Sequence, residues 1–475
     1  MSEQKTPYNQ IDFVVKAPRF RIVFSYMGDK GVAFVREYLL RLLKLTPCKP
    51  EQIARYFGFN QHETQVALAD LEHNKWITWR NDGLIELSDK GERLFLSIND
   101  NSPKIPTLKE FSGEYHMELL DNNFLQKKDC DQNRQNAIEL DIEPKVLSES
   151  SDIARKTFQN RFQQLVENET IEVKNEKGEI ERDISLYKID VIEPKSSPDY
   201  FRFTQSFELL PETGEAKERH DIGNIIHQDN IQQAITQKLK KFGTCDNLRE
   251  LRKSMEVIGD DDTLKILFGG RLDFDEFLKV YEKHDKENGL YFVGQIYHQE
   301  NLFKQIHQIL NNLDKKQAKK LYWIAPSDIY WGKQRKIHDK IQSLINKQKD
   351  KNYQFRLYLP LPPKRNRHEK QEWQHEFKGV AEKDVTEKVL YGFREGFLDG
   401  NTEILFLENQ FAVVCYHTKL ANYPVTLPIG FMTTDKKQIF HIQKLVESYL
   451  TGITYTNDAN DDMQNNDFGL LNKIT

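Results

Sequence analysis

The stretch that decides the organisation of the N-terminal region is QIARYFGFNQHETQVALADLEHNKWI, residues 52–77. It contains two helical patterns separated at Gly58, and glycine is common just past the C-terminus of a helix. Asn60 is predicted to be the N-cap of the second helix, with Glu63 in capping-box register three residues later. The inner face of that helix is expected to carry Val66, Leu68, Ala69 and Leu71.

The flanking residues extend this pattern in both directions. A further helix is expected over 31–45, where apolar residues recur at helical spacing. Beyond it, residues 76–80 and 84–87 flank Asn81-Asp82-Gly83, and Asp-Gly in such a place is a strong hairpin signal. The resulting order over roughly residues 32–97 (helix, helix, turn, helix, hairpin) resembles the winged helix-turn-helix family. Residues 52–77 resemble the helix-turn-helix of MarR-type regulators.

This resemblance implies nucleic-acid binding, because the second helix of the pair enters the major groove in DNA-binding members. Its early residues, expected to be exposed and to contact DNA, are Asn60, Gln61, His62, Thr64 and Gln65. From the hairpin, Arg80 would contact the backbone or the minor groove. Residues 60–75 also carry three acidic side chains against one lysine, and phosphates repel an acidic helix. Protein docking therefore stays open as an alternative use of this module.

Length and composition predict a multidomain α+β protein. The chain has 475 residues, of which 38% are hydrophobic, and its 29 Phe and 19 Tyr supply core material. The expected parts are a winged helix with an N-terminal extension over 1–100 and a mixed α+β middle domain over 101–289. They are followed by a basic α/β domain over 290–455, where strand and helix patterns alternate, and a disordered acidic tail over 456–475.

The spacing of the cysteines and the hydropathy of the chain indicate which kinds of site and which cellular compartment to expect. The four cysteines are far apart and form no CxxC pair, so neither a disulfide framework nor a zinc knuckle is expected. No metal site and no cofactor is predicted from the histidine spacing. The N-terminus is polar, and no run approaches the length of about 18 apolar residues that a membrane span needs. These features indicate a soluble cytoplasmic protein without a membrane partner.

Positive charge is concentrated in the C-terminal third. Residues 304–383 hold 19 Lys or Arg against 8 Asp or Glu, in a chain whose net charge is -5. Such segregation favours nucleic-acid binding, with double-stranded DNA as the expected ligand. The first basic cluster is Lys364, Arg365 and Arg367. The second basic cluster is Lys333, Arg335 and Lys336, next to Tyr330 and Trp331, which suggest stacking beside neutralised phosphates.

The segment 320–450 resembles a phospholipase-D-like half domain. His417-Thr418-Lys419 matches the His-x-Lys element of that family, in which the histidine is the nucleophile and the lysine holds the phosphate without a metal. The family's aspartate position is Pro424 here, and Gly430 is followed by Phe431 and Met432 rather than by a suitable asparagine. The resemblance therefore implies a degenerate domain, and no catalytic residue is assigned.

Together these patterns predict a non-enzymatic DNA-binding subunit of a larger bacterial machine, of the phage-defence, restriction or mobile-element type. The larger assembly is expected because 475 residues is long for a simple repressor, so partner protein subunits are expected as well. Two alternatives stay open. One is a phosphodiesterase or nuclease of phospholipase-D-like fold, and the other is an interaction subunit that docks a partner protein through the winged helix.

Overall fold

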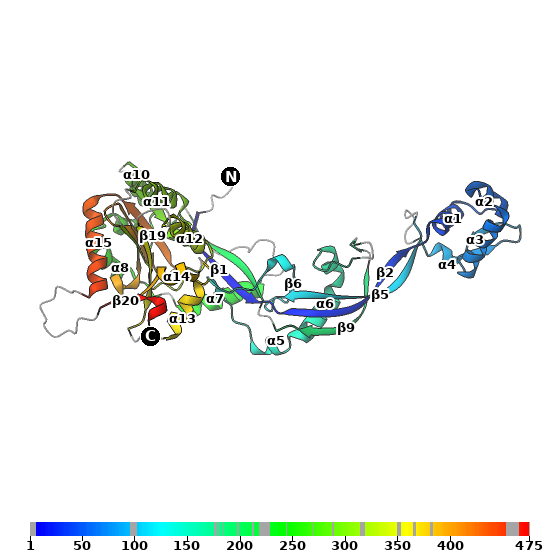
Figure 1. Cartoon of the computed structure of the whole chain (residues 1–475), viewed down its shortest axis with the longest axis horizontal. Coiled ribbons are helices and arrows are strands. Elements are labelled where there is room, and N and C mark those ends of the chain that lie inside the picture. Colours follow the sequence, from blue (N-terminus) through cyan, green and yellow to red (C-terminus); the bar gives the residue numbers. More distant parts are fainter. Residues whose placement is uncertain are drawn as a thin grey trace. The chain divides into compact units, whose positions relative to one another are not determined.

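The chain folds as a mixed α+β protein in two compact units (Figure 1). Unit 1 comprises Met1–Lys16, Asp131–Ile142 and Asp199–Thr475, and unit 2 comprises Ala17–Cys130 and Glu143–Pro198. The computed structural model describes residues 6–95, 102–174, 178, 180–182, 184–196, 199–210, 213–217, 229–243, 245–268, 270–286, 289–313, 319–348, 353–363, 367–380, 383–452 and 465–474. Each unit thus joins segments that are far apart in sequence, which differs from the consecutive domains expected with limits at 100 and 289.

A four-stranded antiparallel sheet organises the first part of unit 2. Its order is β6 (Phe124–Leu125), β5 (Lys104–Met117), β2 (Arg19–Gly31) and β9 (Ser185–Pro194). The long helix α6 (Ser150–Glu167), preceded by α5 (Pro144–Ser148), covers one face of this sheet. The contact is aromatic: the rings of Phe158 and Phe162 lie 5.2 and 5.5 Å from that of Phe24. Rings at such distances add to the stabilisation that burial gives.

Residues 99–112 contain Asn, Asp, Ser and two prolines, a composition that predicts a linker, but residues 104–112 belong to β5 and pair with β2. Two prolines suggested the linker, and Pro106 does lie inside the strand, opposite Asp29. A proline lacks the backbone N–H and is therefore confined to strand edges. The neighbouring strand β6 reaches only His116 and Met117, so among the described residues β5 is an edge strand at Pro106, where a proline is tolerated.

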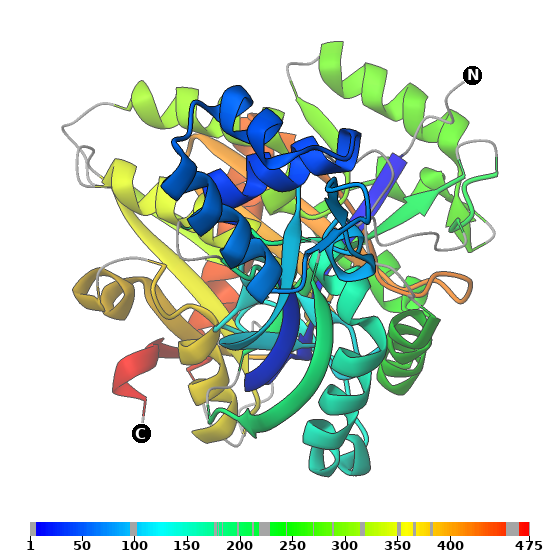
Figure 2. The same cartoon turned by 90° about the vertical axis from the view of Figure 1, so that its right-hand side faces the viewer.

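The second part of unit 2 is a small helical subdomain with a hairpin. Its elements are α1 (Phe34–Leu45), α2 (Pro50–Phe57), α3 (Gln61–His73), β3 (Ile77–Trp79), β4 (Ile85–Leu87) and α4 (Asp89–Glu92). The helices α1 to α3 pack together in both views of the chain (Figures 1 and 2). Their shared core includes Leu39, Leu43, Ile53, Leu68, Leu71, Trp76 and Ile85. The predicted hairpin is confirmed, with Ile77 opposite Leu87 and Gly83 in the turn at a φ of 80°.

The buried face of α3 differs from the one expected, and on α1 only some of the regularly spaced apolar residues are buried. On α3 the buried residues are Thr64, Leu68 and Leu71, at positions i, i+4 and i+7, whereas Val66 is 56% exposed. On α1 the core residues are Leu39, Leu40 and Leu43, while Phe34 and Tyr38 lie outside the core. Apolar spacing alone did not identify the buried face, because both faces of α1 carry apolar side chains.

Unit 1 contains two larger sheets. The first has the order β7 (Cys130–Asp131), β10 (Tyr200–Leu209), β1 (Thr6–Lys16) and β8 (Ile138–Glu139). The second is mixed, with eight strands. Its order is β13 (Leu290–Val293), β19 (Leu427–Thr433), β18 (Phe411–Thr418), β17 (Thr402–Leu407), β14 (Lys319–Ile324), β15 (Tyr353–Leu361), β16 (Leu390–Arg394) and β20 (Asp467–Leu470). Strands β17 and β18 pair antiparallel across the short turn at Asn409 and Gln410, one of two arrangements that the sequence left open for residues 403–416.

Helices cover both faces of the eight-stranded sheet, so its central strands are buried throughout. One face packs against α11 (Glu300–Asn311), α12 (Lys336–Gln348), α13 (Arg367–Glu376) and α14 (Lys383–Val389). The other contacts α8 (Leu248–Ile258) and α15 (Lys436–Thr451). The remaining elements of unit 1 are α7 (Asp229–Phe242), α9 (Asp262–Ile266), β11 (Leu267–Phe268), β12 (Arg271–Leu272) and α10 (Phe274–Lys286).

The disordered tail expected over 456–475 is wrong for residues 465–474. There β20 pairs with β16, and the buried side chains of Leu471 and Ile474 join the core of the sheet. The Asn- and Asp-rich stretch that suggested disorder lies mostly in 453–464, outside the described residues. The apolar side chains of Phe468, Leu471 and Ile474 pack against the sheet, and the polar composition around them concealed this in the sequence.

Two expectations about the whole chain can be compared with the structure. In the described part, no helix has both the length and the apolar character that crossing a bilayer requires. Each of the four cysteines is a free thiol, as the absence of a CxxC pair predicted. Cys48 and Cys415 are buried, Cys245 is exposed and Cys130 is intermediate.

Candidate functional site

The predicted DNA-contacting residues lie at the N-terminal end of α3. Asn60 caps the helix: its side chain accepts a hydrogen bond from the amide of Glu63 at 2.9 Å, and the Glu63 carboxylate accepts the Asn60 amide at 2.9 Å. Gln61, His62 and Gln65 are exposed, and no described residue forms a hydrogen bond with their side chains. Three polar side chains are therefore available at this end of the helix.

Thr64 does not belong to this exposed set. It is 5% exposed, and its hydroxyl donates to the carbonyl of Asn60 at 2.8 Å. Threonine hydroxyls often bond a backbone carbonyl one helical turn earlier, and here that bond turns the side chain toward the core. The expectation that Thr64 contacts DNA is therefore wrong for this conformation.

Two of the three acidic side chains of α3 form hydrogen bonds with other described residues. The Glu63 carboxylate is occupied by the capping bond, and the Asp70 carboxylate accepts a hydrogen bond of 2.9 Å from Arg36 on α1. On the hairpin, Arg80 is exposed and lies 3.9 Å from Asp82 and 3.6 Å from Glu86. Of the three acidic residues that argued against phosphate contact, only Glu72 is exposed without such a bond among the described residues.

The second basic cluster is neutralised within unit 1. Lys333 contacts Glu376 at 2.8 Å, Arg335 contacts Asp131 at 2.5 Å, and Lys336 contacts Glu300 at 3.2 Å. The adjacent aromatic residues Tyr330 and Trp331 are buried, at 4% and 1% exposure. Buried rings cannot stack on bases, so the expected stacking surface is absent there. The pattern of aromatic and basic residues reflects core packing beside ion pairs.

The first basic cluster falls at the start of α13. Lys364 and Arg365 lie outside the described residues. Arg367 is the first residue of α13 and is exposed. The structure does not bring this cluster and the polar end of α3 into one unit, because α13 belongs to unit 1 and α3 to unit 2.

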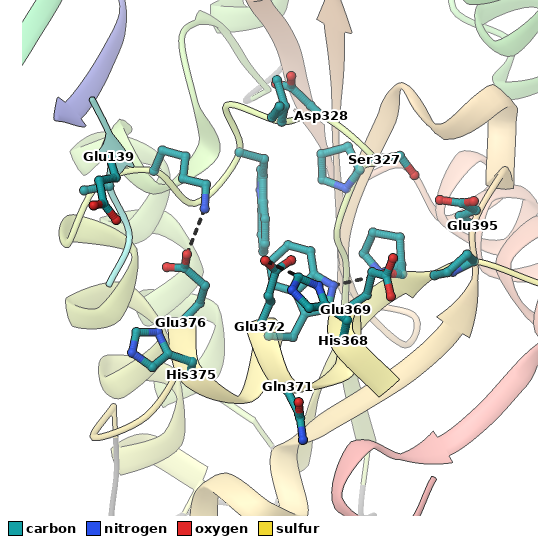
Figure 3. A pocket seen from close by; sticks show the side chains of 18 of the residues that line it. Glu139, Ser327, Asp328, His368, Glu369, Gln371, Glu372, His375, Glu376 and Glu395 are labelled. Atoms are coloured by element: carbon teal, nitrogen blue, oxygen red, sulfur yellow. Dashed lines mark hydrogen bonds and ion pairs between the residues drawn. The ribbon is translucent and has the colours of Figure 1, made fainter. Parts of the chain in front are cut away.

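A cavity of about 810 Å³ lies beside α13 (Figure 3). Its lining includes the aromatic residues Trp331 and Trp373 and the basic residues Arg134 and Lys333. Six carboxylates also line it: Glu139, Asp328, Glu369, Glu372, Glu376 and Glu395. A lining with this excess of negative charge repels phosphate, so the cavity is unsuited to a nucleic-acid backbone.

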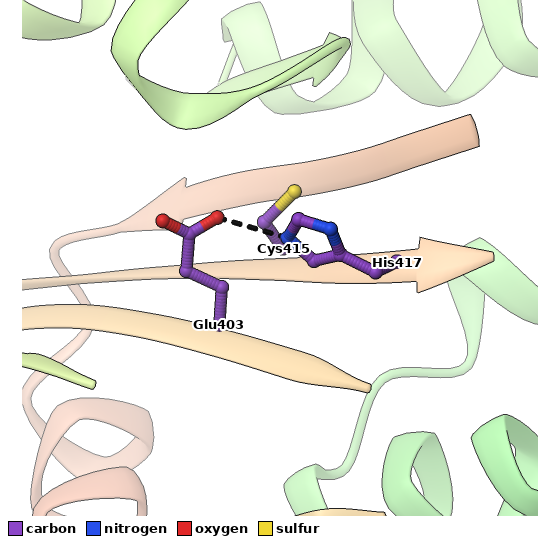
Figure 4. A group of neighbouring side chains, drawn as sticks. All are labelled: Glu403, Cys415 and His417. Atoms are coloured by element: carbon purple, nitrogen blue, oxygen red, sulfur yellow. Dashed lines mark hydrogen bonds and ion pairs between the residues drawn. The ribbon is translucent and has the colours of Figure 1, made fainter. Parts of the chain in front are cut away.

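Asp328 connects the cavity with a buried polar network around His417. The two ring nitrogens of His417 bind two carboxylates: Nδ1 lies 2.7 Å from Asp328 Oδ2, and Nε2 lies 3.0 Å from Glu403 Oε2. The indole nitrogens of Trp323 and Trp331 both donate to Glu403 Oε1 at 2.7 Å. Figure 4 shows Cys415 beside the same histidine. The side chains of His417, Asp328 and Glu403 are fully enclosed.

Electrostatics hold His417 as an imidazolium. Burial alone would lower the pKa of His417, but hydrogen bonds to Asp328, Cys415 and Glu403 raise it well above its usual value. Burial would likewise raise the pKa of Asp328, yet the hydrogen bond and charge of His417 lower it. Burial raises the pKa of the Cys415 thiol to about 11, so this group is protonated at neutral pH.

The hydrogen bonds of His417 affect its ability to act as the nucleophile of the His-x-Lys element. A histidine nucleophile needs a free ring nitrogen, and both nitrogens of His417 are engaged. The backbone amide of Lys419, the other member of the element, donates to Asn247 Oδ1 at 2.7 Å, and the Lys419 carbonyl accepts a hydrogen bond from the Asn247 amide at 3.4 Å. Attack by His417 on a phosphodiester would first require one carboxylate contact to break.

Sequence reasoning missed both Asp328 and Glu403. Asp328 is 89 residues from its partner His417, and no local pattern connects the two. Glu403 is only 14 residues from His417, and the pairing of β17 with β18, which places Glu403 opposite Cys415, is the signal that could have found it. No protein-family model matches the chain, and no curated protein matches its sequence.

Proposed function

We propose that residues 32–95 form a winged helix-turn-helix module, and that the chain binds double-stranded DNA through the N-terminal end of α3. The observation that carries the proposal is the set of exposed, unbonded side chains of Gln61, His62 and Gln65. Glutamine can donate to and accept from an adenine edge at once, which suits reading in the major groove. The order of α1, α2, α3 and the β3–β4 hairpin supports the family resemblance.

The local charges support the same assignment. The ion pair with Arg36 offsets the negative charge of Asp70 and so reduces the repulsion between α3 and phosphate. Arg80 on the hairpin can reach a phosphate by exchanging its long contacts with Asp82 and Glu86. The second basic cluster contributes less than its composition suggests, because each of its members has an internal carboxylate partner. The proposed role is that of a DNA-binding subunit of a larger bacterial machine of the phage-defence, restriction or mobile-element type.

Fluorescence anisotropy with the full chain and a labelled mixed-sequence duplex tests this proposal. Replacing Gln61 and Gln65 by Ala together should weaken binding about tenfold or more, since a good base contact is worth about 1–3 kcal/mol. Arg80→Ala should lower the slope of log affinity against log salt by about 1, because one phosphate contact is lost. Gln164→Ala, which removes an exposed amide from α6 of the same unit, is the matched control.

Two results would overturn the proposal. Wild-type protein that binds no duplex at low salt would exclude DNA binding by the whole chain. Binding that is equally strong in the wild type and the double glutamine variant would exclude α3 as the contacting element. In the latter case, substitution of Arg367 shows whether the start of α13 supplies the affinity.

A second candidate function, docking of a partner protein, is favoured by the outer face of α1. Phe34 is 73% exposed and Leu45 is 81% exposed, and Val35 and Tyr38 lie along the same helix. The rings of Phe34 and Tyr38 are 4.7 Å apart, and Arg41 lies over Tyr38 at 5.2 Å. Clustered exposed apolar groups of this kind are typical of interaction surfaces. The occupant we propose is an amphipathic helix of a partner subunit.

Affinity purification from the native host tests the docking function. Wild-type chain should retain a stoichiometric partner, and a variant with Phe34→Ser and Leu45→Ser should lose it while keeping its DNA affinity. The matched control is Phe440→Ser, which removes a 59% exposed apolar side chain from α15. Equal recovery of the partner with both variants would exclude α1 as the docking surface.

A further inference from the structure

Three side chains with metal-binding atoms meet in the centre of the eight-stranded sheet. Glu403 on β17 lies directly opposite Cys415 on β18, and His417 follows on the same face of β18. One carboxylate oxygen, the Sγ atom and one ring nitrogen lie within 4.8 Å of one another, and all three residues are buried (Figure 4). Thiolate, imidazole and carboxylate are the three kinds of ligand that proteins offer to zinc.

We propose that Glu403, Cys415 and His417 form a binding site for a single divalent ion of the zinc type. The ligand atoms would be Glu403 Oε2, Cys415 Sγ and His417 Nε2, with a fourth position left for a water molecule. This site is independent of the proposed DNA binding, because its residues belong to unit 1.

The surrounding residues hold the ligands as metal sites require. A histidine ligand usually donates its second ring N–H to a carboxylate, which fixes the ring and its tautomer. Asp328 does this for His417, at 2.7 Å from Nδ1, and the hydroxyl of Thr426 donates to the same Asp328 oxygen at 2.8 Å. Trp323 and Trp331 both bind Oε1 of Glu403. The ligand oxygen Oε2 is thereby turned toward His417.

The spacing is close to that of a metal-bound site. Bonds of about 2.0–2.3 Å at tetrahedral angles put ligand atoms about 3.3–3.8 Å apart. The Nε2–Oε2 separation is 3.0 Å, and all three ligand atoms lie within 4.8 Å of each other. Movements of less than about 1 Å, within side-chain freedom, would bring the three atoms to bonding distance.

Charge balance also fits a divalent ion. The network holds two buried carboxylates, and no described lysine or arginine forms an ion pair with Asp328 or Glu403. A divalent ion would place two positive charges beside these carboxylates and would face three ligands at once. Proton release on binding is general for such sites.

The 810 Å³ cavity borders the proposed site. Asp328 and Trp331 line the 810 Å³ cavity, and each forms a hydrogen bond with a proposed ligand residue. The cavity's six carboxylates would attract a cation toward that wall. A small shift of Asp328 and Trp331 would therefore connect the cavity to the ligands.

Cobalt titration of the full chain, after dialysis against a chelator, tests the site. Cobalt bound to a thiolate gives an intense near-ultraviolet band, and this band should grow to one equivalent and vanish when zinc is added. Elemental analysis should then find one zinc per chain, and zinc should raise the melting temperature because it binds the folded state. Cys415→Ser should abolish the thiolate band, whereas Cys48→Ser, which changes a buried thiol in unit 2, should keep it.

The wild-type titration alone can overturn the proposal. Folded wild-type protein that develops no thiolate band and retains less than stoichiometric zinc has no such site. A band that survives in folded Cys415→Ser would place the metal on another thiol. If that variant does not fold, the thiolate band of the wild type and its retention in Cys48→Ser still separate this site from binding to surface carboxylates, which cannot give such a band.

Discussion

His417 and Asp328 form a hydrogen-bonded ion pair of 2.7 Å that is sealed from solvent. Breaking a buried pair by removing one charge leaves the other uncompensated in a medium of low polarity. His417→Gln, which leaves the buried carboxylates of Asp328 and Glu403 without their shared cation, should therefore destabilise the protein by about 3–5 kcal/mol, measured by urea unfolding of the full chain. Glu300→Gln, which removes an exposed carboxylate from Lys336 and Lys340, should cost about 0–1 kcal/mol. Equal losses in the two variants would contradict the assigned importance of burial.

The N-cap of α3 allows stability to be separated from recognition. Asn60→Ala removes the side-chain bond to the Glu63 amide and should lower the free energy of unfolding by about 1 kcal/mol. Gln61→Ala should change stability by less than about 0.5 kcal/mol, since its side chain has no described partner. Thermal unfolding followed by circular dichroism measures both. A larger loss from Gln61→Ala than from Asn60→Ala would show that the helix begins elsewhere.

Two apolar residues of α3, the buried Leu71 and the exposed Val66, test which face of the helix packs against the core. Leu71 is completely buried, so Leu71→Ala should cost about 2–5 kcal/mol through lost contacts and a residual cavity. Val66 is 56% exposed, and Val66→Ala should stay within about 0.5 kcal/mol. Chemical denaturation of the two variants gives the difference directly. Similar losses would mean that α3 is rotated relative to its described position.

His298 should make stability depend on pH in the mildly acidic range. Burial lowers the pKa of His298 to about 4; Gln334 raises it through a hydrogen bond, and the charges of Lys336 and Lys340 lower it further. The unfolded chain takes up this proton near pH 6.5 and the folded chain only near pH 4, so stability falls as pH drops between these values. The expected loss is at most about 3 kcal/mol. His298→Gln should flatten the curve of unfolding free energy against pH over this window, and an unchanged slope would assign it to another group.

Local signals predicted much of the fold. Asp82-Gly83 fixed the position of the β3–β4 hairpin, and Asn60 with Glu63 fixed the start of α3. The alternating strands and helices of the C-terminal third are present as well. What these signals share is that the deciding residues are close in sequence and act through backbone geometry. The prediction failed where a tertiary contact decided, as at Pro106, which is tolerated because β5 has an open edge there.

In the candidate sites, too, local signals predicted some residues correctly and failed where a tertiary contact decided. Gln61, His62 and Gln65 are exposed as expected, since helix position alone largely determines their exposure. The second basic cluster was misread because its partners, Glu376, Asp131 and Glu300, come from three other segments of the chain. Charge counted along a sequence does not distinguish a lysine that faces solvent from one that an internal carboxylate neutralises.

The alternation of the two units along the chain has a consequence for synthesis. Strand β1 is translated early, but its main partner β10 begins at Tyr200, after most of unit 2 has left the ribosome. Strand β9, which pairs with β2 in unit 2, also precedes β10 in the chain. Strand β1 therefore lacks its main partner while most of unit 2 is synthesised, with only the short strand β8 available beside it. An unpaired strand edge of this kind is exposed to aggregation during synthesis.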